Sequence, residues 1–151
     1  MMRKLIGLFI PAFLLALLTH QVLGNESRKE LNKKAVLAFY EQAINQRDFA
    51  AASKYLSPRY IQHNQRAADG ADGLKNFIAF LREKFPRSHS TIKRVFVDGD
   101  YVILHVHAVR EPGTRGMAIV DIFRLDKGKV VEHWDVHEDI IENPSNGNGM
   151  F

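Results

Sequence analysis

The second half of this chain, residues 91–140, most constrains its fold, because it contains four runs rich in Val, Ile and Phe. The runs are separated by DGD, EPGTRG and DKGK, which are all typical turn sequences. Consecutive apolar runs joined by such short connections pair as antiparallel neighbours. The sequence therefore predicts a four-stranded antiparallel meander.

The segment in front of this meander has a helical pattern. Apolar residues in 27–56 return every three or four positions, and Ser27 and Glu30 are placed like a capping box at a helix start. Asp48 is placed to cap a second, shorter helix over residues 49–56, and Pro58 would end it.

A short strand and a third helix are expected next. Residues 59–64 read as the strand, and a loop at Gly70 and Gly73 follows. Residues 74–85 place their apolar side chains on one stripe, and Pro86 stops the helix. Helices followed by an antiparallel meander are typical of the α+β fold class.

The N-terminus reads as a secretory signal peptide, residues 1–24. Arg3 and Lys4 precede an apolar run from Leu5 to Leu18, and a short polar segment ends at the small residue Gly24. The run is shorter than the roughly 20 residues that span a bilayer, which favours cleavage near Gly24 over an uncleaved anchor. Contact with a membrane is expected only through this segment, and the mature protein is expected to be secreted or periplasmic.

The remaining chain is expected to hold one domain, residues 25–140, and a C-terminal tail, residues 141–151. Removing the two basic residues of the signal peptide takes 21 basic residues to 19 against 17 acidic ones, so the formal net charge falls from +4 to +2. The basic residues are mixed with acids on helix-like segments, and this argues against a nucleic-acid-binding surface. With no cysteine in the chain, stability must come from packing alone.

Polar residues interrupt the predicted strands. His105 and His107 share one face of their strand, and Val102, Leu104 and Val106 lie on the opposite face. We expect this second, apolar row to form the outer face of the sheet, where another subunit would pair. The two histidines also have a spacing that metal sites on sheets use, so a metal-binding protein stays a candidate.

The last two strands carry further polar residues. Asp121 lies in an otherwise apolar row, which requires a reason for its burial, and His133 shares a face with Asp135. A plain two-residue turn at Lys127 and Gly128 would put Trp134 opposite Asp121, whereas one extra, bulged residue would put His133 there.

Four stretches of the sequence, FYEQAINQRDF, YIQHN, DIFRLDKGKVVEHWDV and NGNGMF, together with the order of elements, resemble a known family. The chain resembles SnoaL-like proteins of the polyketide cyclase type within the nuclear-transport-factor-2-like superfamily, over most of residues 30–151. The resemblance implies a cone-shaped barrel, in which a strongly bent antiparallel sheet wraps around three N-terminal helices and leaves an internal pocket. Enzymes and non-catalytic binding domains share this cone, so fold alone does not decide function.

The resemblance also implies a site. Tyr40 falls where ketosteroid isomerases of the superfamily keep an oxyanion-binding tyrosine, and His63 falls where they keep a proton-abstracting acid. Asp121 resembles the proton-transferring acid of SnoaL-type cyclases, and His107 resembles its histidine partner. These four are the predicted catalytic residues. The predicted pocket also includes His105, His133, Asp135 and Phe123, and the alignment of His133 and Asp135 with pocket positions favours the bulged register.

The function expected from this resemblance is acid/base catalysis on a small apolar carbonyl compound, by aldol cyclisation, isomerisation or dehydration. A carboxyl group and an imidazole in an apolar pocket suit proton transfer next to a carbonyl. No cofactor is expected, and a homodimer is. The alternatives are an exported, non-catalytic domain that binds a small molecule and, less in keeping with the family, a His/Asp metal-binding protein.

Overall fold

The computed structural model of the chain describes residues 12–151, and the side chains of residue 24 and of residues 26–151. The helical elements of this range are α1 (Ala12–Tyr40), the π-helical turn η1 (Glu41–Asn45), α2 (Phe49–Ala52), the 3₁₀ turn η2 (Ser53–Tyr55) and α3 (Gly70–Lys84). The strands are β1 (Leu56–Gln62), β2 (His89–Asp98), β3 (Tyr101–Val109), β4 (Met117–Asp126) and β5 (Lys129–Asp139).

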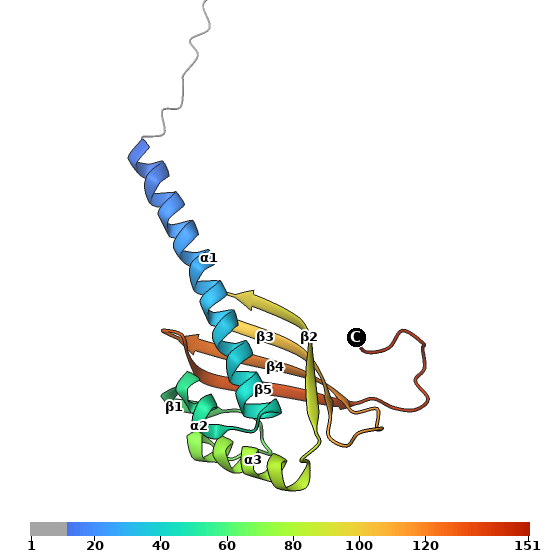
Figure 1. Cartoon of the computed structure of the whole chain (residues 1–151). Helices are drawn as coiled ribbons and strands as arrows, with labels where there is room; N and C mark the ends of the chain where they lie inside the picture. The colour runs from blue at the N-terminus through green and yellow to red at the C-terminus, as the bar shows by residue number, and fades with distance from the viewer. Residues whose placement is uncertain (1–11) are drawn as a thin grey trace, which may run out of the picture.

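Within residues 12–151 the strands form one curled, open sheet in the order β1-β5-β4-β3-β2. Strands β2 to β5 make the predicted antiparallel meander, and β1 adds to its edge in parallel with β5. The last turns of α1 lie across the concave side of the sheet, with α2 and α3 at one end (Figure 1). The α+β cone is therefore confirmed, with an open sheet.

The core lies between α1 and the concave face of the sheet. Val36 and Phe39 of α1 pack with Val102, Leu104 and Val106 of β3, and the three β3 residues have no exposed surface. The prediction that this β3 row forms an outer, dimerising face is therefore wrong. The curl of the sheet turns the continuous apolar row toward the helices, where it buries most apolar area.

Several predicted boundaries also shift. Ser27 and Glu30 lie inside α1, which already begins at Ala12, so they do not cap a helix start. The N-terminus of α3 is set by Asp69, whose carboxylate accepts from Gly70 N, so Gly70 and Gly73 belong to α3 and not to a loop. Gly73 is required there because a Cβ atom would lie 1.9 Å from the carbonyl oxygen of the preceding loop.

The second helix is capped as predicted but is shorter than expected. The side chain of Asp48 accepts from Ala51 N, 2.9 Å away. The helix gives way to η2 before residue 56, and Pro58 lies within β1 and does not end the helix. Proline is tolerated there because β1 is an edge strand, which needs no ladder hydrogen bond on its outer side.

The register of β4 and β5 contains the extra residue that the sequence left open. The turn at Lys127 and Gly128 has positive φ at both residues, as a tight two-residue hairpin requires. The register then shifts between Arg124 and Leu125, which leaves one extra residue in β5. The bulge is present, but Asp135 and not His133 pairs with Asp121, because His133 pairs with Phe123 two positions along.

Residues 1–11 of the predicted signal peptide lie outside the described residues. α1 runs through the predicted cleavage position near Gly24 without a break, and the cleavage stays a prediction. In the part of the chain that the structure describes, no helix is both long enough and apolar enough to cross a membrane.

Candidate functional site

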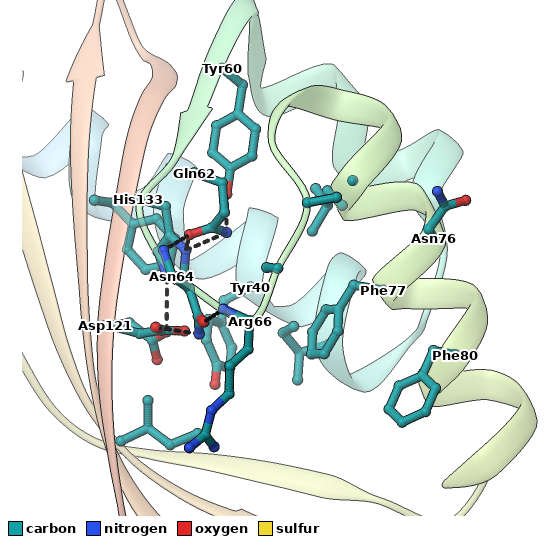
Figure 2. Close-up of a pocket in the computed structure, with 18 of the residues that line it drawn as sticks. Tyr40, Tyr60, Gln62, Asn64, Arg66, Asn76, Phe77, Phe80, Asp121 and His133 are labelled. Carbon is teal, nitrogen blue, oxygen red and sulfur yellow. Dashed lines mark hydrogen bonds and ion pairs between the residues drawn. The ribbon is translucent and has the colours of Figure 1, made fainter.

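A cavity of about 680 Å³ opens between the concave face of the sheet and α3. Its size suits a small organic ligand. Figure 2 shows Asp121 and His133 on the sheet side, with Phe77 and Phe80 projecting from α3 on the other. The rest of its apolar wall includes Phe39, Ile44, Leu74, Ile119 and Phe123.

A hydrogen-bonded acid and imidazole lie at the base of this cavity. His133 Nε2 is 3.0 Å from Asp121 Oδ1, and the two residues are 8% and 5% exposed. The other carboxylate oxygen, Asp121 Oδ2, is buried without a hydrogen-bond partner among the described residues. Burying such an oxygen costs free energy, and a function would explain why the fold keeps it.

The side chain of Gln62 on β1 orients His133 from the other side. Asn64 N donates to Gln62 Oε1 over 2.9 Å, which directs Gln62 Nε2 toward Tyr60 Oη and His133 Nδ1, each 3.0 Å away. A neutral His133 therefore carries its proton on Nε2 and donates it to Asp121. A doubly protonated ring would find Gln62 Oε1 as an acceptor at 3.2 Å, so Gln62 suits both protonation states.

Two buried tyrosines border this acid–imidazole pair. Tyr40 is the last residue of α1 and is 4% exposed. Burial first and the charge of Asp121 second raise its pKa well above the usual value, and the closeness of its hydroxyl group to the Asp121 side chain adds to this. The hydrogen bond with Ser90 and the charge of Arg110 have smaller, opposite effects. Burial also raises the pKa of Tyr60, with the charge of Asp135 adding to the effect. Both hydroxyl groups therefore stay protonated and can donate hydrogen bonds.

Asp135 and His137 of β5 form a second acid–imidazole pair nearer the opening. His137 Nε2 is 3.1 Å from Asp135 Oδ2, and Asn64 Nδ2 donates to Asp135 Oδ1 over 2.6 Å. Burial acts to raise the pKa of Asp135, but the hydrogen bonds from His137 and Asn64 outweigh it and lower the pKa. The same hydrogen bond raises the pKa of His137. The hydrogen bond therefore favours the charged form of both partners.

One group of side chains in this cavity could also hold a metal ion. Ligand atoms of Asp121, His133 and Asp135 lie within 4.8 Å of one another. However, both oxygens of Asp135 accept hydrogen bonds, and His133 uses both ring nitrogens. A metal would have to replace these bonds, so the donor set fits an ion poorly.

Five of the eight predicted site residues line the cavity: Tyr40, Asp121, His133, Asp135 and Phe123. The other three, His63, His105 and His107, do not, so the expectation that all four catalytic candidates converge is wrong. His63 stacks on Trp134 at 4.4 Å. His105 and His107 lie on the outer face of β3, where both rings contact the C-terminal residue Phe151.

The cavity also contains residues that the sequence reasoning missed. Tyr60, Gln62 and Asn64 alternate along one side of β1 and its extension, and His63 lies on the other side. Arg110 likewise continues the inward row of β3 by period-two alternation. The signal was therefore the alternation itself, within the predicted strand 59–64 for the first three residues and one position past β3 for Arg110.

The sequence profile of the SnoaL-like domain matches residues 36–133, which include the end of α1, the other helices, β1 to β4 and the first part of β5. The chain belongs to the SnoaL-like domain family. No curated protein matches the chain at a significant level.

Solved structures show the same fold at low sequence identity. An NTF-2-like protein of unknown function from Burkholderia xenovorans LB400 is 20% identical, with a TM-score of 0.64, over 78% of this chain and 91% of that one. A candidate SnoaL-like polyketide cyclase from Jannaschia sp. CCS1 is 21% identical, with a TM-score of 0.60, over 73% and 87% of the two chains. AclR from Streptomyces galilaeus, a candidate hydroxylase, is 20% identical, with a TM-score of 0.60, over 73% and 76%.

Proposed function

We propose that this protein is a cofactor-independent acid/base enzyme that transfers a proton on a small apolar carbonyl compound. The observation that carries the proposal is the buried oxygen Asp121 Oδ2, which lies in an apolar cavity without a hydrogen-bond partner among the described residues. The family supports it, because a similar structure is named as a candidate polyketide cyclase.

In the proposed reaction, Asp121 Oδ2 accepts a proton from the carbon next to the ligand carbonyl, and the C–H electron pair moves into an enolate. Tyr40, whose hydroxyl group stays protonated, donates a hydrogen bond to the enolate oxygen. His133 holds Asp121 Oδ1 in place and takes the role expected of His107. Returning the proton to another carbon gives isomerisation, and attack of the enolate on a second carbonyl gives aldol cyclisation.

The proposal can be tested without knowing the substrate. A panel of cyclic ketones, aryl ketones and 1,3-dicarbonyl compounds is incubated with the protein in D₂O, and exchange of the α-protons is followed by NMR. We expect at least one compound to exchange faster with the protein than with buffer, and Asp121→Asn to slow that exchange by about 10²-fold or more.

The second candidate is a non-catalytic domain that binds a small apolar molecule, which the aromatic wall of the cavity favours. That function predicts ligand-induced chemical shifts in the protein without α-proton exchange in any ligand. Binding at the cavity with no exchange across the whole panel would therefore refute the catalytic proposal.

We also infer export through the signal peptide at residues 1–24, on the sequence pattern alone. Expression of the full chain in a bacterium with a periplasm is expected to yield a protein whose N-terminal sequence starts near residue 25. Recovery of the intact chain in the cytoplasmic fraction alone would contradict this.

A further inference from the structure

Arg110 is half-buried in the wall of the cavity, and no polar partner in the described part of the chain accounts for this burial. Its guanidinium group packs over the Phe77 ring, with the central carbon 5.8 Å from the ring centroid. Among the described residues, no hydrogen bond or ion pair to its side chain is present, although the charge of Asp121 acts on it. Burial lowers its pKa, which reflects a desolvated cation.

An arginine in this position is well suited to bind an anion. Its fork of donors matches a carboxylate, and in a site with little water each charge-assisted bond is stronger than a neutral one. Arginines that only stabilise a fold are usually paired, as Arg124 is with Glu132 at 2.6 Å on the outer face of the sheet. The donors of Arg110 are therefore available to a ligand.

The charges of the cavity wall agree with a single anionic group. Arg66 and Arg110 contribute two positive charges and Asp121 and Asp135 two negative ones. The hydrogen bond with Asp135 raises the pKa of His137, which favours a third positive charge in the wall. One carboxylate would balance this excess. A dianion such as a phosphate ester would instead leave a surplus negative charge close to Asp121.

We propose that Arg110 binds the carboxylate of the ligand, so that the protein acts on small apolar oxo acids with one carboxylate group. The apolar part of such a ligand would contact Phe77 and Phe80, and its carbonyl group would reach Asp121 and Tyr40. This inference deepens the proposed function and rests on it for the oxo group, but not for the carboxylate.

The test compares two probes of nearly equal shape, 3-phenylpropionate and 3-phenylpropanamide, by calorimetric titration of the protein at pH 7. We expect the acid to bind about 10-fold more tightly than the amide, the ratio that roughly 1.4 kcal/mol gives. Arg110→Gln should remove this preference by weakening the acid about 10-fold, with the amide changed by less than about 2-fold.

Arg59→Gln is the matched control, because Arg59 is exposed on β1 and does not line the cavity. It removes the same charge and should leave both affinities unchanged. Arg110→Lys keeps the charge and loses the fork, so it should retain part of the preference even if Arg110→Gln folds poorly.

A preference for the acid that persists in Arg110→Gln would overturn the proposal, as would equal affinities in the parent protein. A loss of preference in Arg59→Gln would show a general charge effect and also overturn it. Asp121→Asn should keep the preference for the acid. Failure of the catalytic proposal, which is measured by α-proton exchange, is therefore distinguishable from failure of this one.

Discussion

The substitution Asp121→Asn separates stability from chemistry at this site. The volume hardly changes, and the amide oxygen of the introduced asparagine can still accept from His133 Nε2, which lies 3.0 Å from Asp121 Oδ1 in the parent. Losing the charge assistance of that bond costs about 1 kcal/mol. The introduced amide nitrogen takes the place of Asp121 Oδ2 and also lacks a partner there, so only the cost of burying the charge is removed, about 1 kcal/mol. The two effects nearly cancel, so the free energy of unfolding should change by less than about 1 kcal/mol.

At about 2–4 °C per kcal/mol for a chain of this size, the melting temperature should stay within about 4 °C of the parent value. The assay is thermal melting together with urea denaturation, beside the α-proton exchange measurement, which should fall by about 10²-fold. Asp135→Asn is the matched control. Asp135 pairs with Asp121 across the strands, but its two oxygens accept from His137 and Asn64. Its loss should destabilise the protein by about 1–3 kcal/mol.

If Asp121→Asn melted several degrees lower, as Asp135→Asn should, Asp121 would be a structural acceptor and the reasoning would be refuted. Normal melting with normal exchange would also refute it, because the acid would then have neither function. Only a stable variant that binds ligand without exchanging protons agrees with the proposed chemistry.

Three other predictions follow from the same structure. The contribution of the Asp135–His137 pair to stability depends on pH. Because the pKa of Asp135 is lowered, the contribution is present above about pH 4. Because the pKa of His137 is raised, the contribution decreases as the pH rises past about 6.5. In urea denaturation, His137→Gln should therefore lose more stability relative to the parent at pH 5.5 than at pH 8.5, and an equal loss at both would contradict the pairing. We expect less than one equivalent of zinc in the purified protein by elemental analysis, and unchanged melting after chelation, because His133 and Asp135 already use their ligand atoms in hydrogen bonds. A stoichiometric ion would contradict this. The homodimer remains a proposal and now rests on exposed apolar residues of the outer sheet face, such as Phe96 at 56% exposure. Light scattering should show a dimer that Phe96→Glu weakens, and a monomer at high concentration would count against it.

The sequence predicted the meander and the α+β class because both depend on local information. Apolar runs between short turns define the strands, and the polar residue Asp48 is placed to start α2. Local sequence did not predict the start of α1. Ser27 has the pattern of a cap, but the chain in front of it is also helical. A capping pattern marks a helix start only where the preceding residues are not helical.

The site was harder to predict, because alternation gives two faces for each strand without saying which one is inward. In β3 the continuous apolar row is buried, and the histidines His105 and His107 are therefore outside. The prediction that His105 and His107 line the pocket required the opposite orientation of β3. The burial of apolar area decides which face is inward. Burying the side chains of Val102, Leu104 and Val106 stabilises the fold more than burying two polar rings would.

The bulge in β5 determines which residues meet Asp121. Without the extra residue, Trp134 would pair with Asp121, and the acids and imidazoles of β5 would turn to the outer face. With it, Asp135 pairs with Asp121 directly and His133 reaches the same carboxylate from the neighbouring pair. The polar residues in this hairpin are therefore explained by register. One extra residue in β5, opposite the step from Arg124 to Leu125, shifts the register. The shift directs the side chains of His133, Asp135 and His137 into the cavity.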